Sequence, residues 1–399
     1  MSSNSKRKIA YYTVGCRANQ YQTSQLIAQL TTNNLQLTTF SDKADVYVIN
    51  TCTVTSDADR RSRQMIRTAL RRNPKAEIIV TGCYARLCPN ELAELSPRIK
   101  PIPSPSLEPS TQNPEPKIRE NLMIEDGCNN FCAYCIVPYA RGPVKSRPQE
   151  QVINEAKVLL DAGAREIVLT GINLGAYQHD LGSLVPRLTS LKKLIRLRLS
   201  SIEPMYLTEK LIKTVAREPK ACHYFHVPLQ TGDNGLLRRM KRRYTAEEYL
   251  LLIGLIRRLV PDCGISTDVI AGLPGETETA FRNTFKIIKE AGLSRLHVFP
   301  YSKRPGTPAA AMKGQVDPKT IKARKNELLA LDRQLRQKFA SKFLGQELAI
   351  LVEQKNVGLT DNFIKVRYKG KSSDIGQLIR VKVNQAEAGE CVGMRVDSR

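Results

Sequence analysis

The stretch Glu125-Asp126-Gly127-Cys128-Asn129-Asn130-Phe131-Cys132-Ala133-Tyr134-Cys135 places three cysteines on one short loop. Three thiolates at this spacing can bind three irons of a four-iron cluster, since each thiolate coordinates a different iron. A fourth local cysteine would complete the coordination for electron transfer alone, yet the chain continues with Ile136-Val137-Pro138-Tyr139. The loop therefore predicts a cluster in which one iron stays open to another ligand.

The alternative is a zinc knuckle, which normally needs a fourth Cys or His at similar spacing. The next such residue is His179, too far along the chain to belong to the same motif. The C-x3-C-x2-C spacing resembles the radical S-adenosylmethionine (SAM) superfamily. That resemblance implies that the open iron binds the amino and carboxylate groups of SAM. Reductive cleavage of SAM would then yield a radical that removes hydrogen from an unactivated C–H bond.

The composition favours a nucleic-acid partner. A length of 399 residues predicts two or three domains. The 62 Lys and Arg against 38 Asp and Glu give a net charge of +24, which favours a polyanionic partner over a basic surface that serves solubility alone. No apolar run reaches the ~20 residues of a membrane span, and no signal peptide is predicted at the amino terminus. Ten scattered cysteines are no disulfide framework, so we expect a soluble, cytoplasmic protein.

Residues 1–96 alternate strand-like and helix-like segments, which is typical of an open parallel sheet. Cys16, Cys52 and Cys83 each follow the carboxyl end of a predicted strand. Because such ends converge at one edge of a parallel sheet, the three thiols are expected to meet. They either bind a second cluster or serve as small buried side chains. The predicted strands are Lys8–Val14, Ala44–Asn50 and Ala76–Thr81, and the predicted helices are Thr23–Leu30 and Asp57–Arg72.

The rest of the chain predicts a linker and two further domains in an α/β protein. Residues 97–117 are rich in Pro and Ser and predict a linker. Residues 118–342 predict a partial (βα)6 barrel with active residues at the carboxyl ends of its strands, and residues 343–399 predict a small β-barrel. The expected barrel strands are Asn121–Glu125, Glu166–Thr170, Leu194–Leu199, His223–Val227, Ile265–Ala271 and Arg295–Phe299, with helices that include Pro148–Ala162, Ala246–Val260 and Lys319–Lys342.

Taken together, these features resemble the radical-SAM methylthiotransferase family, whose last domain is called TRAM. The resemblance covers almost the whole chain and rests on Val14–Gln20, Val48–Thr55, Thr81–Ala85 and Thr267–Thr277. Leu296–Ala310, with Gly15-Cys16-Arg17, looks most like the branch that acts on N6-threonylcarbamoyladenosine 37 in tRNA. Its product carries a 2-methylthio group. Sister branches act on isopentenyladenosine in tRNA or on an aspartate of a ribosomal protein.

The resemblance implies a catalytic loop, two 4Fe-4S clusters and a SAM pocket. Cys128, Cys132 and Cys135 would hold the SAM cluster, and Cys16, Cys52 and Cys83 the second one. In the SAM pocket, Tyr134 would contact the adenine. The rest of the pocket would be formed by residues at the ends of strands: Thr170, Gly171, Ser200, Ser201, Glu203, His226, Gln230 and Gly272. Each has a plainer alternative, because Tyr134 could be a packing aromatic, His226 a structural histidine, and strand-end turns need Gly and Ser anyway.

The implied partners are a tRNA anticodon stem-loop and an electron donor of reductase or flavodoxin type. The protein itself is expected to be a monomer. Two basic stretches could bind the tRNA backbone: Arg238–Tyr244, and Arg60–Arg63 with Arg67, Arg71 and Arg72. One departure from the family is expected, because the chain runs from Leu92 directly into the linker. The first domain would then be shortened by a final strand and helix. The competing class is a non-catalytic, metal-containing RNA-binding protein.

Overall fold

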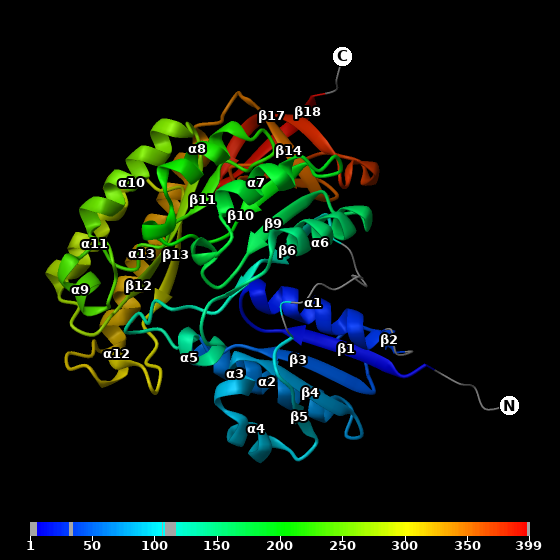
Figure 1. The fold of residues 1–399 in the computed structure, drawn as a ribbon. Coiled ribbons are helices and arrows are strands. Elements are labelled where there is room, and N and C mark those ends of the chain that lie inside the picture. Colours follow the sequence, from blue (N-terminus) through cyan, green and yellow to red (C-terminus); the bar gives the residue numbers. More distant parts are fainter. Residues whose placement is uncertain (1–5, 32–34, 106, 108–116, 397–399) are drawn as a thin grey trace.

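The computed structural model describes residues 6–31, 35–105, 107 and 117–396. It consists of three parts that follow one another along the chain (Figure 1). An amino-terminal sheet domain is drawn in blue and cyan, a central barrel in green and yellow, and a small carboxyl-terminal barrel in red. This is the predicted α/β architecture.

The amino-terminal domain is a five-stranded parallel sheet of order β2-β1-β3-β4-β5. All six residues of β3 are buried, as expected for a central strand with helices on both faces. The Thr55 side chain caps α2 by accepting a hydrogen bond from the Ala58 amide. The elements are β1 (Lys8–Thr13), α1 (Arg17–Thr31), β2 (Gln36–Leu37), β3 (Val46–Thr51), α2 (Ser56–Arg72), β4 (Glu77–Gly82), α3 (Cys83–Leu87), α4 (Pro89–Leu95) and β5 (Ile99–Pro101).

The structure extends this domain beyond its expected end at residue 96. Helix α4 follows the third cysteine, and β5 then pairs in parallel with β4 inside the range assigned to the linker. Strand β5 was not predicted because it has only three residues and ends in Pro101. Proline disfavours a strand in general but is tolerated at the edge of a sheet. Most of the remaining predicted linker, residues 106 and 108–116, lies outside the described residues.

The central domain has its six parallel strands in the order β6, β9, β10, β11, β12, β13. They form two three-stranded sheets, which meet at bridges between Leu197 and Ala221 and between Ser201 and His226. The open edges are therefore β6 and β13, and α1 packs beside β6. The strands are β6 (Arg119–Met123), β9 (Glu166–Thr170), β10 (Arg196–Leu199), β11 (Tyr224–His226), β12 (Gly264–Ala271) and β13 (Arg295–Pro300).

Helices cover the outer face of these strands, and a short hairpin carries the cysteine loop. The helices are α5 (Val137–Arg141), α6 (Gln149–Asp161), α7 (Leu181–Thr189), α8 (Glu209–Arg217), α9 (Asn234–Arg239), α10 (Ala246–Leu259), α11 (Glu278–Ala291) and α12 (Pro308–Ala311). The hairpin strands are β7 (Glu125–Asp126) and β8 (Lys145–Ser146), which pair antiparallel.

Helix α13 (Pro318–Ser341) leads into a closed barrel of order β14-β15-β16-β18-β17. Its strands are β14 (Glu347–Gln354), β15 (Val357–Leu359), β16 (Lys365–Tyr368), β17 (Leu378–Glu387) and β18 (Glu390–Val396). This barrel packs on the amino ends of the central strands. The Phe363 ring stacks on Tyr224 with centroids 4.6 Å apart, and the Arg198 guanidinium lies 4.9 Å from the same ring.

Replacing Gly82 with alanine should destabilise the amino-terminal sheet strongly. Gly82 has φ +94°, which side chains rarely adopt, and a Cβ there would lie 2.2 Å from the Thr51 carbonyl oxygen. We expect Gly82→Ala to lower the midpoint of urea unfolding, with a cost of about 2 kcal/mol or more. Gly163→Ala is the matched control, since Gly163 also has positive φ but its Cβ would meet nothing within 4 Å. Equal losses in both variants would contradict the steric argument.

Candidate active site

The cysteine loop runs from β7 into α5 and is held at both ends by the backbone. The Cys128 amide donates to the Gly142 carbonyl at 3.1 Å, and the Ala133 amide donates to the Met240 carbonyl at 3.0 Å. Burial raises the pKa of Cys128 to about 11 and that of Cys135 to about 12, and the neighbouring Cys132 adds to both shifts. The three thiols therefore lie close together, and a nearby metal charge would be needed to keep Cys128 and Cys135 ionised.

Among the described residues, no three His, Cys, Asp or Glu side chains are placed to hold a single metal ion. A four-iron cluster is bound differently, since each thiolate ligates its own iron. The three thiols at this loop therefore suit a cluster by their number and placement, with no fourth thiolate supplied by the loop.

Arg242 is a site residue that the sequence placed elsewhere. It belongs to the basic stretch predicted to bind RNA, but its side chain is buried. Its Nη1 donates to Cys132 Sγ at 3.1 Å, and it forms an ion pair with the Glu203 carboxylate. Glu203, predicted to reach SAM, is thus tied to the cysteine loop through Arg242. The exposed cations of that stretch are Arg238, Arg239, Lys241 and Arg243.

The end of β9 meets the loop through Glu125, a residue that the sequence did not single out. Thr170 is buried as the last residue of β9, and a Cβ on Gly171 would lie 2.4 Å from Glu125 Oε2. The Asn173 amide donates to the same Oε2 at 2.8 Å, and Asn173 Nδ2 lies 3.9 Å from Cys128 Sγ. Gly171 therefore has no room for a side chain, because it packs against Glu125.

Several buried polar atoms near the loop lack partners among the described residues. They include Ser200 Oγ at the end of β10, Asn173 Oδ1 and Glu125 Oε1. Unsatisfied buried groups of this kind are costly unless a ligand or water pairs with them. A ligand rich in hydroxyl, amino and carboxylate groups, such as SAM, fits this donor set. The backbone of Ser201 forms the bridge to His226, and a contact of its side chain with SAM stays a prediction.

Replacing Glu125 with glutamine should change how stability depends on pH. Burial raises the pKa of Glu125 to about 8, so the folded chain binds a proton that the unfolded chain has lost at neutral pH. The raised pKa of Glu125 adds to the free energy of unfolding. This contribution is fully present below the unfolded pKa of about 4.3 and is lost as the pH rises through about 8. Thermal unfolding of the metal-free protein should therefore show Glu125→Gln gaining stability over the wild type as the pH rises. Parallel pH profiles of the two proteins would contradict this.

A pocket of about 190 Å³ joins the loop to the amino-terminal domain. Tyr134 and Cys135 line it on one side, and Val54 and Thr55, which follow Cys52, line it on another. Gln230 and Asp268 also line this pocket, so three of the predicted residues, Tyr134, Cys135 and Gln230, share one cavity. The full lining is Val54, Thr55, Tyr134, Cys135, Ile136, Gln230, Asp268, Ile270, Phe299, Pro300, Tyr301 and Ser302.

His226 and Gly272 lie outside this lining. His226 pairs through Nε2 with Asp268 Oδ1 at 3.2 Å, and its Nδ1 lies 3.1 Å from Ser266 Oγ. Despite this distance, Nε2 makes no hydrogen bond with a described residue, so a role for His226 at the pocket stays a prediction. At Gly272, a Cβ would lie 2.3 Å from the side chain of Ile321 on α13. The missing side chain is therefore required by packing against α13, and the adenine contact stays a prediction.

Cys16, Cys52 and Cys83 converge at the carboxyl edge of the first sheet, as the parallel topology predicts. They follow β1, β3 and β4, which are adjacent strands. A Cβ on Gly15 would lie 3.0 Å from Cys52 Sγ, so glycine is needed for the close approach of the two turns. Burial raises the pKa of Cys52 to about 12, and Cys83 and Cys16 add to that shift. Burial raises the pKa of Cys83 as well.

Arg141 connects the two cysteine groups. It ends α5, directly after the loop, and its side chain is 4% exposed. Its Nη1 pairs with Asp126 Oδ1 at 2.8 Å, while its Nη2 donates to Asn19 on α1. Although burial lowers the pKa of Arg141, Cys83, Asp126 and Cys16 together raise it above its ordinary value. One buried cation therefore faces thiols of the second group from the domain that carries the first.

The second basic stretch, on α2, is only partly available. Arg60, Arg67 and Arg71 are exposed and line a shallow hollow on the helix surface, where Arg60 pairs with Asp57 at 2.9 Å. The other three arginines contact neighbouring residues: Arg61 contacts Tyr12, Arg63 contacts Tyr84 and Glu91, and Arg72 contacts Phe40.

Among the described residues, no helix is both long and apolar enough to cross a bilayer.

Comparison with known proteins fits this geometry. Residues 123–288 match the model of the Radical SAM superfamily, and residues 8–102 match the model described as Uncharacterized protein family UPF0004. The structure of the radical S-adenosylmethionine methyltransferase TsrM from Kitasatospora setae aligns with a TM-score of 0.56. That alignment covers 76% of this chain and 77% of TsrM at 14% identity, so it speaks for the fold alone. Fold and cysteine loop define a radical SAM enzyme, which uses SAM and a 4Fe-4S cluster.

Full-length relatives make the assignment more specific. The Threonylcarbamoyladenosine tRNA methylthiotransferase MtaB of Bacillus subtilis is 38% identical, over 95% of this chain and 94% of the relative. The protein of that name from Aquifex aeolicus is 37% identical, over 94% and 100%. A tRNA-2-methylthio-N(6)-dimethylallyladenosine synthase from Endomicrobium trichonymphae is 32% identical, over 96% and 98%. This chain belongs to the radical SAM tRNA methylthiotransferase family.

Proposed function

We propose that this enzyme replaces the C2 hydrogen of N6-threonylcarbamoyladenosine 37 in tRNA with a methylthio group, using SAM and two 4Fe-4S clusters. The observation that carries the proposal is the pocket between the two cysteine groups. Cys135 lines it from the first group, and Val54 and Thr55 line it directly after Cys52 of the second. An adenine in this pocket would lie between the site of hydrogen removal and the site of sulfur supply.

Each part of the chain has a role in this proposal. Cys128, Cys132 and Cys135 would hold one cluster, and Cys16, Cys52 and Cys83 the other. When bound, the SAM cluster supplies the electron that cleaves SAM to a hydrogen-abstracting radical. The protein positions the adenine and excludes water, and the apolar side chains of Val54, Ile136 and Ile270 suit that task.

The proposed partners follow from charge and chemistry. A tRNA anticodon stem-loop would lie against the exposed arginines of α2 and the exposed cations Arg238, Arg239, Lys241 and Arg243, in a protein of net charge +24. The modified base would have to leave the stacked loop to reach the pocket. Reduction of the cluster would require a small electron donor of reductase or flavodoxin type. We propose a cytoplasmic monomer.

The nucleoside is decided by a direct comparison of substrates. The reconstituted enzyme is incubated with SAM, reductant and a tRNA carrying either the threonylcarbamoyl or the dimethylallyl group, and the digested nucleosides are analysed by mass spectrometry. We expect the methylthio product only from the threonylcarbamoyl tRNA. A product formed mainly from the dimethylallyl tRNA would overturn the substrate assignment, and a product from neither would overturn the proposal as a whole.

A further inference from the structure

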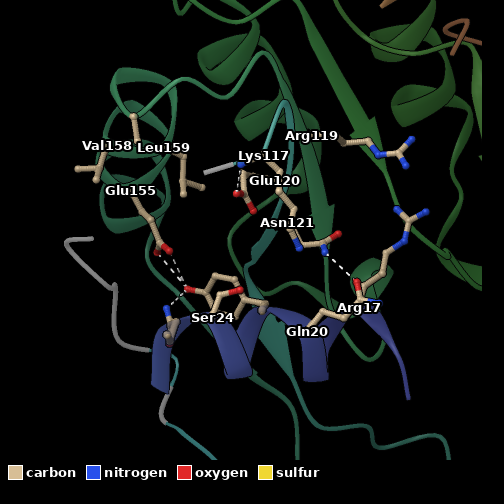
Figure 2. Close-up of a pocket in the computed structure, with 13 residues that line it drawn as sticks. Arg17, Gln20, Ser24, Lys117, Arg119, Glu120, Asn121, Glu155, Val158 and Leu159 are labelled. Carbon is tan, nitrogen blue, oxygen red and sulfur yellow. Dashed lines mark hydrogen bonds between the residues drawn. The ribbon is translucent and has the colours of Figure 1, made fainter. Parts of the chain in front are cut away.

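Arg17, the residue that follows Cys16, has a half-buried side chain without an acceptor. The guanidinium of Arg17 makes no hydrogen bond or ion pair with any residue that the structure describes. Figure 2 shows it beside the guanidinium of Arg119, at one end of a cavity between α1 and β6. The cavity measures about 210 Å³, below the ~300–1,000 Å³ of sites for whole drug-sized ligands, so it suits a side group.

Cations outnumber anions around Arg17. Arg119 and Arg198 lie close enough for their charges to oppose that of Arg17. Arg295, the first residue of β13, has no acceptor among the described residues either, and it faces Tyr224 and His297 together with Arg17. The carboxylates nearby already have partners: Glu166 pairs with Arg198 at 2.7 Å, and Glu353 with Arg119 at 3.0 Å. Of the two carboxylates that line the cavity, Glu155 pairs with Arg147 at 2.6 Å, and Glu120 accepts a hydrogen bond from the Lys117 amide at 2.8 Å. Arg17 and Arg295 are therefore left as uncompensated charges at the open side of the barrel.

These cations lie within reach of the pocket between the cysteine groups. Asp268 lines that pocket and is level with His297 in the pairing of β12 with β13, and Arg295 is two residues further down β13. Two residues along a strand span ~7 Å. The extended N6–CO–NH–CH–COO⁻ chain of a threonylcarbamoyl group is ~5 Å long, by standard amide bond lengths. An arginine side chain is long enough to span the distance that is left between the end of this substituent and the strand.

Resting on the function proposed above, we propose that Arg17, together with Arg295, binds the carboxylate of the substituent at N6 of the adenine. A dimethylallyl group has no charge and would leave both guanidiniums without a partner. The two arginines therefore select the substrate: they bind the charged group and leave an unpaired buried charge behind a neutral one.

Binding of three anticodon stem-loop RNAs of one sequence tests this inference. The base at position 37 is threonylcarbamoyladenosine, its methyl ester or unmodified adenosine, and dissociation constants for the reconstituted enzyme are measured by fluorescence anisotropy under anaerobic conditions. We expect the wild type to prefer the free carboxylate over the ester at least tenfold. Arg17→Gln should abolish this preference and bind the ester and the unmodified RNA like the wild type, whereas Arg17→Lys should keep part of it. Arg333→Gln, at an exposed position on α13, serves as the control.

Iron content is measured in each variant, because Arg17 adjoins a proposed cluster ligand. A preference that persists in Arg17→Gln at full iron content would overturn the inference. Equal weakening towards all three RNAs would also overturn it, since a phosphate contact acts on every RNA alike. The function proposed above fails separately: it is contradicted if the wild type forms no methylthio product from the threonylcarbamoyl RNA, whatever the variants bind.

Discussion

Replacing Cys52 with alanine should stop methylthiolation while leaving SAM cleavage partly intact. Replacing Cys128, Cys132 or Cys135 should abolish SAM cleavage itself, because the loop supplies no other thiolate. The two groups lie on different domains, so loss of one ligand need not release the other cluster. Formation of 5′-deoxyadenosine and of the methylthio nucleoside, measured in one reaction, separates the two effects.

Cys263→Ala is the matched control, since Cys263 is fully buried in the central barrel and has no thiol partner. It should retain both products. Wild-type methylthiolation by Cys52→Ala would contradict the role given to the second cysteine group. Continued SAM cleavage by all three loop variants would contradict the role of the first.

Replacing Arg141 with methionine should have the second large effect. Its ion pair with the half-buried Asp126 would be broken, and because the remaining carboxylate is partly exposed, the cost should be below the about 3–5 kcal/mol of a fully buried pair. The cation facing Cys16 and Cys83 would also be lost, and because Arg141 lowers the pKa of Cys83, that thiol should be harder to keep ionised. We expect a lower urea midpoint and loss of iron mainly from the second cysteine group.

Arg141→Lys separates charge from packing, because it keeps the cation but loses the forked donor geometry. It should retain more iron than Arg141→Met at comparable stability. Full iron content in Arg141→Met, with an unchanged urea midpoint, would show that the residue supports neither the domain contact nor the thiols.

The sequence predicted the cysteine groups because topology determines them. Cys16, Cys52 and Cys83 had only to follow parallel strands in order to converge, and the structure places those strands side by side. The loop of Cys128, Cys132 and Cys135 is local, so its spacing needed no tertiary information. The short edge strand β5 was missed, because three residues give too little periodicity.

The charged residues around the cysteines could not be predicted. Arg242 stands between exposed cations in the sequence, and only the fold shows that it points inward to Cys132 and Glu203. Glu125 and Arg141 likewise gain their partners, Asn173 and Asp126, from tertiary packing. A buried ion pair leaves no periodic pattern in the sequence. The charge of Arg242 therefore predicted an RNA-binding surface, whereas its side chain lies buried in the site.

Iron and acid-labile sulfide per chain, measured after anaerobic reconstitution, test the central claim most directly. Two clusters held by separate thiolate groups predict about eight irons in the wild type and about four in the Cys128→Ala/Cys132→Ala/Cys135→Ala variant. About four irons in the wild type and none in the variant would contradict the account, because Cys16, Cys52 and Cys83 would then hold no cluster.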